Sequence, residues 1–191
     1  MAKTLAVGLT GGMGSGKSEA LRALRRLGAR TLCLDEVAHR VLAKGGAAYG
    51  PVLRSFGPAV LGRDGEIDRG ALGRAVFAAP RLRRRLERLT HPAILREMRR
   101  RIRKSRRHRG LLVVDAPLLF EAGLEKEFDL TAVVTASRAR RIRRLRRRDD
   151  LPLRELRRRM AAQLPLAEKA RRADVVIGND GTRGELRRKL R

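Results

Sequence analysis

One segment decides the fold of this chain: Leu5-Ala6-Val7-Gly8-Leu9-Thr10-Gly11-Gly12-Met13-Gly14-Ser15-Gly16-Lys17-Ser18. It begins with an apolar run of strand length, and the residues that follow it, 19–24, have the spacing of a helix. From Gly11 to Ser18 the pattern is G-x-x-x-x-G-K-S, which is typical of a phosphate-binding loop where it joins a strand to a helix. The sequence therefore predicts a strand, a phosphate-binding loop and a helix in this order.

The residue types in this loop fit the binding of a nucleoside triphosphate. Glycines let the backbone turn so that its N–H groups approach phosphate oxygens, and a helix N-terminus favours anions. We expect Lys17 to contact the β- and γ-phosphates during catalysis and the Ser18 hydroxyl to ligate Mg²⁺. The expected ATP-binding residues are Gly12, Met13, Gly14, Ser15, Gly16, Lys17 and Ser18. The alternatives are a plain glycine-rich turn, which gives no reason for Gly-Lys-Ser at this spacing, and a dinucleotide fingerprint, whose G-x-G-x-x-G order is absent here.

Length and composition narrow the class of protein. The 191 residues suit one α/β domain with helical insertions. Apolar stretches are too short to cross a membrane, and the N-terminal residues lack the pattern of a signal peptide. Cys33 is the only cysteine, so an internal disulfide is excluded and a cytoplasmic location is expected.

The net charge of +27 arises from 47 basic residues, mostly arginine, against 20 acidic ones. One interpretation is a nucleic-acid-binding surface, because such charge attracts phosphate backbones. The other is solvated helix faces, because the arginine runs alternate with leucine and isoleucine at helical spacing and contain few aromatic residues for base stacking. Non-specific binding of polyanions at low salt is expected in either case.

Strand and helix signals alternate along the chain, which favours a parallel sheet with helices on both faces. The expected strands are 4–9, 30–34, 111–114, 130–135 and 175–177, and the stretch from 47 to 109 is almost wholly helical. Ligands of such sheets bind beyond the carboxyl ends of the strands, so Asp35, Asp115, Pro117 and Asn179 should gather with the phosphate-binding loop.

The same pattern indicates a small-molecule kinase. The Asn-Lys-x-Asp motif of GTPases is absent, and the arginine-rich segment 137–172 has the charge that a lid over a triphosphate requires. We predict one P-loop kinase domain with a nucleotide-binding core (1–46, 110–136, 173–191), a helical acceptor-binding insertion (47–109) and a helical lid (137–172). A nucleoside or nucleotide kinase and an RNA-binding P-loop protein remain as alternatives at this point.

Beyond these inferences, the chain resembles the dephospho-coenzyme A kinase family along nearly its whole length. Singly the matching segments are weak signals, but their order and spacing together are specific. They are Val7–Ser18, Asp35–Val41, Asp64–Arg69, His91-Pro92, Pro117–Glu121, Arg144–Asp149 with Gln163, and Ala173–Gly181. The resemblance implies transfer of the ATP γ-phosphate to the ribose 3′-hydroxyl of dephospho-coenzyme A, which gives coenzyme A in the final step of its synthesis.

The resemblance also assigns residues to roles. Asp35 matches the proposed base of the family and its acceptor side, while Cys33 replaces the first aspartate of the usual Asp-Ala-Asp. His91, Pro117 and Leu118 match acceptor-side positions, Arg144 and Asn179 nucleotide-side positions, and Arg148 a catalytic position in the lid. Simpler roles are open for Asp35 as an N-cap, for His91 and Asn179 in turns, and for Asp115 as a turn residue rather than a Mg²⁺ ligand through water.

Overall fold

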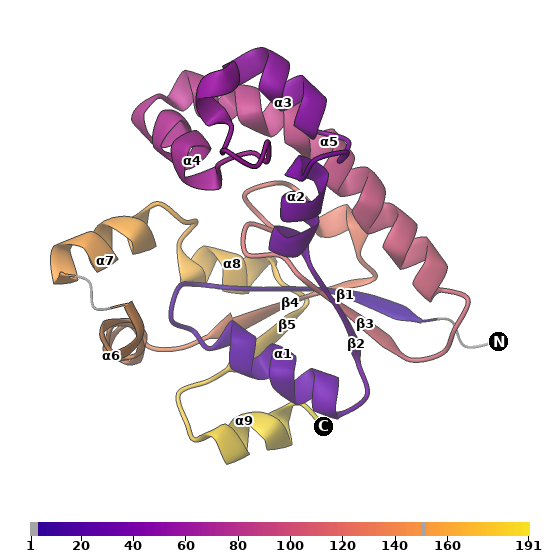
Figure 1. Cartoon of the computed structure of the whole chain (residues 1–191). Helices are drawn as coiled ribbons and strands as arrows, with labels where there is room; N and C mark the ends of the chain where they lie inside the picture. The colour runs from indigo at the N-terminus through magenta and orange to yellow at the C-terminus, as the bar shows by residue number, and fades with distance from the viewer. Residues whose placement is uncertain (1–3, 150–151) are drawn as a thin grey trace. The chain divides into compact units, whose positions relative to one another are not determined.

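The computed structural model describes residues 4–149 and 152–191, and it divides into two compact units (Figure 1). The first unit comprises the described residues up to Cys33 together with Ser105–Arg191, and the second is Leu34–Lys104. The second unit therefore includes residues that precede position 47, where we expected the helical insertion to start. The predicted core (1–46) and lid (137–172) each contain a few residues that lie outside this description.

A five-stranded parallel sheet forms the centre of the first unit, which confirms the predicted fold class. The strand order is β2-β3-β1-β4-β5, so β1 is the central strand. Leu9 of β1 pairs with Asp115 of β3, and Cys33 of β2 pairs with the same aspartate. The strands are β1 (Leu5–Gly11), β2 (Arg30–Cys33), β3 (Leu111–Asp115), β4 (Leu130–Thr135) and β5 (Val175–Gly178). Because all run in one direction, the ends of β1 and β3 lie side by side.

Helices cover both faces of this sheet. In Figure 1, α1 and α9 lie together on one face and α8 lies on the other. Between α1 and the sheet, Leu9, Ala20, Val113 and Val134 are buried in one apolar cluster that also includes Leu186 of α9. The helical segments of this unit are α1 (Lys17–Arg26), η2 (Glu125–Glu127), α6 (Arg138–Asp149), α7 (Leu153–Ala161), α8 (Leu166–Arg172) and α9 (Arg183–Lys189).

The second unit is built from helices. Asp68 accepts hydrogen bonds from the amides of Gly70 and Ala71, so its side chain caps the start of α4. A single antiparallel bridge joins Leu61 to Ile67 between α3 and α4. The segments are α2 (Leu34–Leu42), α3 (Tyr49–Phe56), η1 (Pro58–Val60), α4 (Arg69–Ala78) and α5 (Pro80–Ser105), whose last residue belongs to the first unit.

The structure excludes two of the simpler roles that the sequence left open. Strand β2 ends at Cys33 and α2 begins directly at Leu34, so Asp35 lies in the first turn of this helix and is not its N-cap. His91 lies inside the long helix α5 and not in a turn. The expectation of a turn relied on Pro92, but proline can stand in a helix interior at the cost of one backbone hydrogen bond.

The arginine runs follow the pattern of amphipathic helices. Leu145 in α6 and Leu156 in α7 are fully buried, whereas the arginines that follow them are exposed. Several arginines pair with a carboxylate on the same helix, as Arg158 and Arg159 do with Glu155. This arrangement agrees with solvated helix faces. No helix in the described part of the chain is long and apolar enough to cross a membrane.

Candidate active site

The phosphate-binding loop connects the central strand to α1, as the sequence predicts. It begins where β1 ends at Gly11, and α1 starts at Lys17. Gly16 stands at the N-cap position, and no side chain caps this helix. The amides of Gly16, Lys17 and Ser18 donate to no other described residue, so this end of α1 retains free N–H donors. Free donors and the positive end of the helix dipole are the groups that bind a phosphate.

Two glycines in the loop are required by its geometry. Gly14 and Gly16 have φ angles of 75° and 90°, which side chains rarely adopt. A Cβ atom on Gly14 would lie 2.6 Å from the carbonyl oxygen of Arg141, and one on Gly16 would collide with the side-chain amide of Asn179. The loop therefore packs too closely against α6 and the residue after β5 to accept larger residues.

The outward-facing carbonyl groups of the loop are held by three side chains. Nε of Arg141 donates to the carbonyl of Met13 at 2.8 Å, and Arg144 donates to the carbonyl of Ser15 at 3.0 Å. The same Ser15 oxygen accepts a bond of 2.8 Å from Nδ2 of Asn179. Arg144 also donates to the backbone oxygen of Asn179, which joins the arginine and the asparagine. These bonds fix the orientation of the loop's peptide groups.

Arg141 is a residue that the sequence alone did not reveal. It stands one helical turn before Arg144, and this spacing was the signal that could have pointed to it. Arg141 lies in a run of arginines, however, and the sequence does not distinguish the one that contacts the loop from its neighbours. Burial lowers the pKa of its guanidinium from the usual range, and the charge of Arg138 acts in the same direction. An arginine remains protonated in this setting, so it keeps its donors for the loop.

Lys17, at the start of α1, forms an ion pair with Asp115 of β3. Asp115 is the last residue of β3, and its side chain is 11% exposed, compared with 16% for Lys17. The aspartate was expected near Mg²⁺ through water, and here it contacts the lysine directly. The pair places a cation and a carboxylate beside the free N–H donors at the start of α1.

The remaining predicted residues are Arg148 in α6, two residues that follow β3, and two residues of the other unit. Arg148 is 65% exposed and pairs with Asp149, whereas Arg144 is bonded to the loop. Pro117 and Leu118 follow β3, where the carbonyl of Pro117 accepts bonds and the Leu118 side chain is 53% exposed. Asp35 and His91 are exposed in α2 and α5 of the second unit.

Loss of the Arg144 contacts should weaken nucleotide binding more than folding. We expect Arg144→Ala to raise the Kd for ATP about tenfold, because two or more loop carbonyls lose a charged donor. Titration calorimetry with ATP gives this value directly. Arg143→Ala, on the exposed side of the same helix, is the matched control and should bind ATP normally. Equal affinity in both variants would contradict this role for Arg144.

The site supplies few protein ligands for a metal ion. Among the described residues, no group of three or more His, Cys, Asp or Glu side chains could hold one. Ser18 is exposed in the first turn of α1, and Asp115 ends the adjacent strand. One hydroxyl and one carboxylate fit Mg²⁺, which keeps several waters and takes its other ligands from substrate phosphates.

Comparison with known proteins identifies the family. The model of the family described as dephospho-CoA kinase matches residues 5–185. A dephospho-CoA kinase from Geobacillus kaustophilus is 43% identical over 188 residues, which cover 98% of this chain and 94% of the relative.

Solved structures agree with this match. TT1252 from Thermus thermophilus has a TM-score of 0.84 at 36% identity, over 98% of this chain and 95% of its own. The dephospho-CoA kinase from Campylobacter jejuni has a TM-score of 0.72 at 25% identity, over 97% and 92% of the two chains. The chain thus belongs to the dephospho-CoA kinase family of ATP-using P-loop kinases.

Proposed function

We propose that this protein transfers the γ-phosphate of ATP to the ribose 3′-hydroxyl of dephospho-coenzyme A and so completes the synthesis of coenzyme A. One observation carries the proposal: the phosphate-binding loop, with its free N–H donors and the Lys17–Asp115 pair, stands in a chain that matches the dephospho-CoA kinase family over residues 5–185. Phosphoryl transfer needs positioning and charge stabilisation rather than covalent chemistry, and this site offers both.

In this proposal the loop amides and Lys17 bind the phosphates of ATP. Lys17 exchanges part of its contact with Asp115 for the phosphate oxygens, where its charge is most useful as the transferred group moves. Asp35, exposed in the first turn of α2, accepts the proton of the acceptor hydroxyl. Arg148 is free of loop contacts in this structure and contributes its charge from the proposed lid, residues 137–172.

Mg²⁺ belongs to the proposal as the partner of ATP. Ser18 would hold it through its hydroxyl, and Asp115 through a water molecule. The ion supplies neutralisation of the negative charge on the β- and γ-phosphates.

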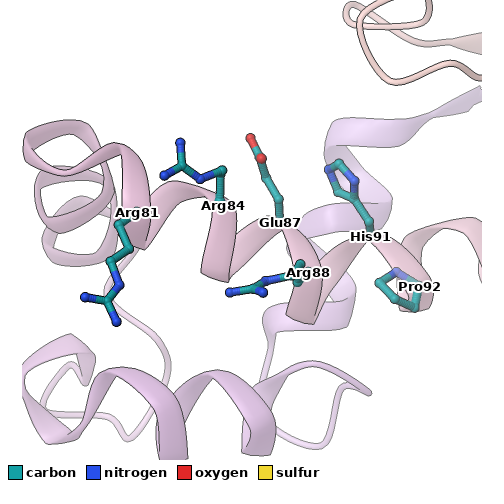
Figure 2. Close-up of a pocket in the computed structure, with 6 residues that line it drawn as sticks. All are labelled: Arg81, Arg84, Glu87, Arg88, His91 and Pro92. Atoms are coloured by element: carbon teal, nitrogen blue, oxygen red, sulfur yellow. The ribbon is translucent and has the colours of Figure 1, made fainter.

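The acceptor side of the proposal involves the helical unit. A hollow of about 710 Å³ lies along α5, lined by Arg81, Arg84, Glu87, Arg88, His91 and Pro92. Figure 2 shows Arg84, Glu87 and His91 projecting from the same side of the helix. Pro92 has no N–H, so the carbonyl of Arg88 lacks its helical donor and remains an acceptor. Guanidinium donors beside a free acceptor suit a molecule that carries both a diphosphate and hydroxyl or amide groups, as dephospho-coenzyme A does.

Turnover with a panel of acceptors tests the function. We expect ATP consumption and a phosphorylated product with dephospho-coenzyme A, and no comparable turnover with nucleosides, nucleotides or RNA. Product mass and its position of phosphorylation identify the reaction. Equal or faster phosphorylation of a nucleoside, or tight RNA binding that survives high salt without turnover, would overturn the proposal.

The hollow on α5 gives a separate prediction. Replacing Arg84 and His91 together by glutamine should raise the KM for dephospho-coenzyme A about tenfold, because charged hydrogen bonds to the diphosphate are lost. The KM for ATP should stay the same. Arg85→Gln, an exposed neighbour that does not line the hollow, is the control. A change in the KM for ATP alone would place the two residues elsewhere in the reaction.

Three further expectations belong to the proposal. The predicted division of the chain assigns acceptor binding to 47–109 and lid closure to 137–172, and the reaction is placed in the cytoplasm. Polyanions should bind weakly and lose affinity steeply with added salt, because exposed arginines bind them through counterion release.

A further inference from the structure

We propose that Lys169 is a positioning residue that locks the segment after α7 onto the phosphate-binding loop and thereby sets the affinity for ATP. The inference rests on the proposed function only because it takes ATP as the ligand of the loop. Lys169 lies in α8, and its side chain has no exposed surface, which makes it the largest fully buried side chain in the described part of the chain. A buried ammonium group is costly unless it is paired, so its partners indicate what it is for.

The ammonium group of Lys169 has two partners in the loop after β3. It donates to the carbonyl of Pro117 at 3.0 Å and to Oε1 of Glu121 at 2.8 Å. Burial raises the pKa of the Glu121 carboxyl, but hydrogen bonds from Lys169 and from the amides of Glu121 and Leu164 outweigh this and lower it overall. Glu121 is therefore ionised and forms a charged pair with the lysine.

The first partner connects Lys169 to the strand that carries the phosphate-binding loop. The carbonyl of Pro117 also accepts a bond of 3.1 Å from the hydroxyl of Thr10, a fully buried residue directly before Gly11. Pro117 stands two residues after Asp115, the partner of Lys17. One oxygen atom thus joins α8, the end of β1 and the end of β3.

The second partner connects Lys169 to the segment between α7 and α8. Oε1 of Glu121 accepts a bond of 3.0 Å from the amide of Leu164. The preceding residue, Gln163, accepts a bond of 3.1 Å from the amide of Met13 with its own Oε1. Two consecutive residues of this segment therefore contact the β3 loop and the phosphate-binding loop.

These contacts form one connected network from Lys169 to Met13. The charge of Lys169 holds Glu121, Glu121 holds the backbone at Leu164, and this places the Gln163 carboxamide against the phosphate-binding loop. The backbone of Met13 is then held on both sides, because its amide donates to Gln163 and its carbonyl accepts from Arg141. A loop held in this way is ordered before ATP arrives, and less ordering is needed on binding.

A double-mutant cycle tests the network through ATP affinity alone. We expect Lys169→Met and Gln163→Ala each to raise the Kd for ATP by about tenfold, and the double variant to bind no more weakly than Lys169→Met by itself. Calorimetric titration of ATP needs no acceptor, so its outcome is independent of which molecule the enzyme phosphorylates. If the enzyme did not phosphorylate dephospho-coenzyme A, the expected ATP affinities would stay the same.

The chain offers a control lysine in the other unit. Lys44 is exposed and belongs to the helical second unit. Lys44→Met should bind ATP as the unmodified protein does. Lys169→Arg keeps the charge and the donors, and it should recover most of the affinity that Lys169→Met loses.

Three outcomes would overturn the inference: normal ATP affinity in a folded Lys169→Met variant, additive losses with Gln163→Ala, or an equal loss in Lys44→Met. If Lys169→Met does not fold, Glu121→Ala replaces it in the same cycle, because the Glu121 side chain is 23% exposed and tolerates truncation better. Coupling between Glu121→Ala and Gln163→Ala is then expected, and its absence contradicts the network.

Discussion

We expect replacement of Lys17 by alanine to lower kcat by about 10²–10³, while ATP should still bind through the loop amides. The reason lies in the position of the ammonium group. Lys17 is the first residue of α1, beside the free N–H donors, and its partner Asp115 ends the neighbouring strand. Charge on the phosphates moves during transfer, and a cation aimed at that charge lowers the barrier more than it strengthens ground-state binding. Steady-state rates with dephospho-coenzyme A measure the effect.

Two controls separate this effect from unfolding. The alanine variant leaves Asp115, whose side chain is only 11% exposed, without its cation, so some loss of thermal stability is expected. Adding Asp115→Asn should recover stability but not turnover. Lys44→Ala, at an exposed lysine in the helical unit, should behave normally. A correctly folded Lys17→Ala variant with near-normal kcat would refute the phosphoryl-transfer role of the loop.

We expect replacement of Asp35 by asparagine to lower kcat by about 10²–10⁴ and to leave the affinity for ATP nearly unchanged. Asparagine keeps the size of the side chain and its place in the first turn of α2, but it does not accept a proton from the acceptor hydroxyl. The measurement is a pair of values for each variant, kcat with both substrates and the Kd for ATP alone.

The neighbouring residue gives a matched control for Asp35. Glu36 is exposed in the same helical turn, and Glu36→Gln should retain full turnover. If Asp35→Asn weakens ATP binding while kcat is maintained, Asp35 belongs to the nucleotide side of the reaction. If both variants are slowed equally, turnover depends on the negative charge of this helical turn and not on Asp35 as a base.

Local signals in the sequence were sufficient for most of the sheet. The strands at 130–135 and 175–177 were predicted to within a residue, because each is a short apolar run bounded by polar residues. The predicted boundary between β2 and α2 was less accurate. Leu34 was expected in the strand, yet it is the first residue of the helix. A buried leucine satisfies either element, so the apolar pattern does not distinguish them.

The sequence by itself determined the phosphate-binding loop, since its glycines, Lys17 and Ser18 are adjacent along the chain and their spacing is the motif. Only the tertiary structure decided which distant residues support that loop. Arg144 was singled out only by the family resemblance, Arg141 was one arginine among many, Lys169 was one lysine of several, and Gln163 lies 150 positions from the amide it contacts. The physical reason is that burial and hydrogen-bond partners depend on how β1, β3, α6 and α8 pack, and packing over such separations leaves no periodic signal in the chain.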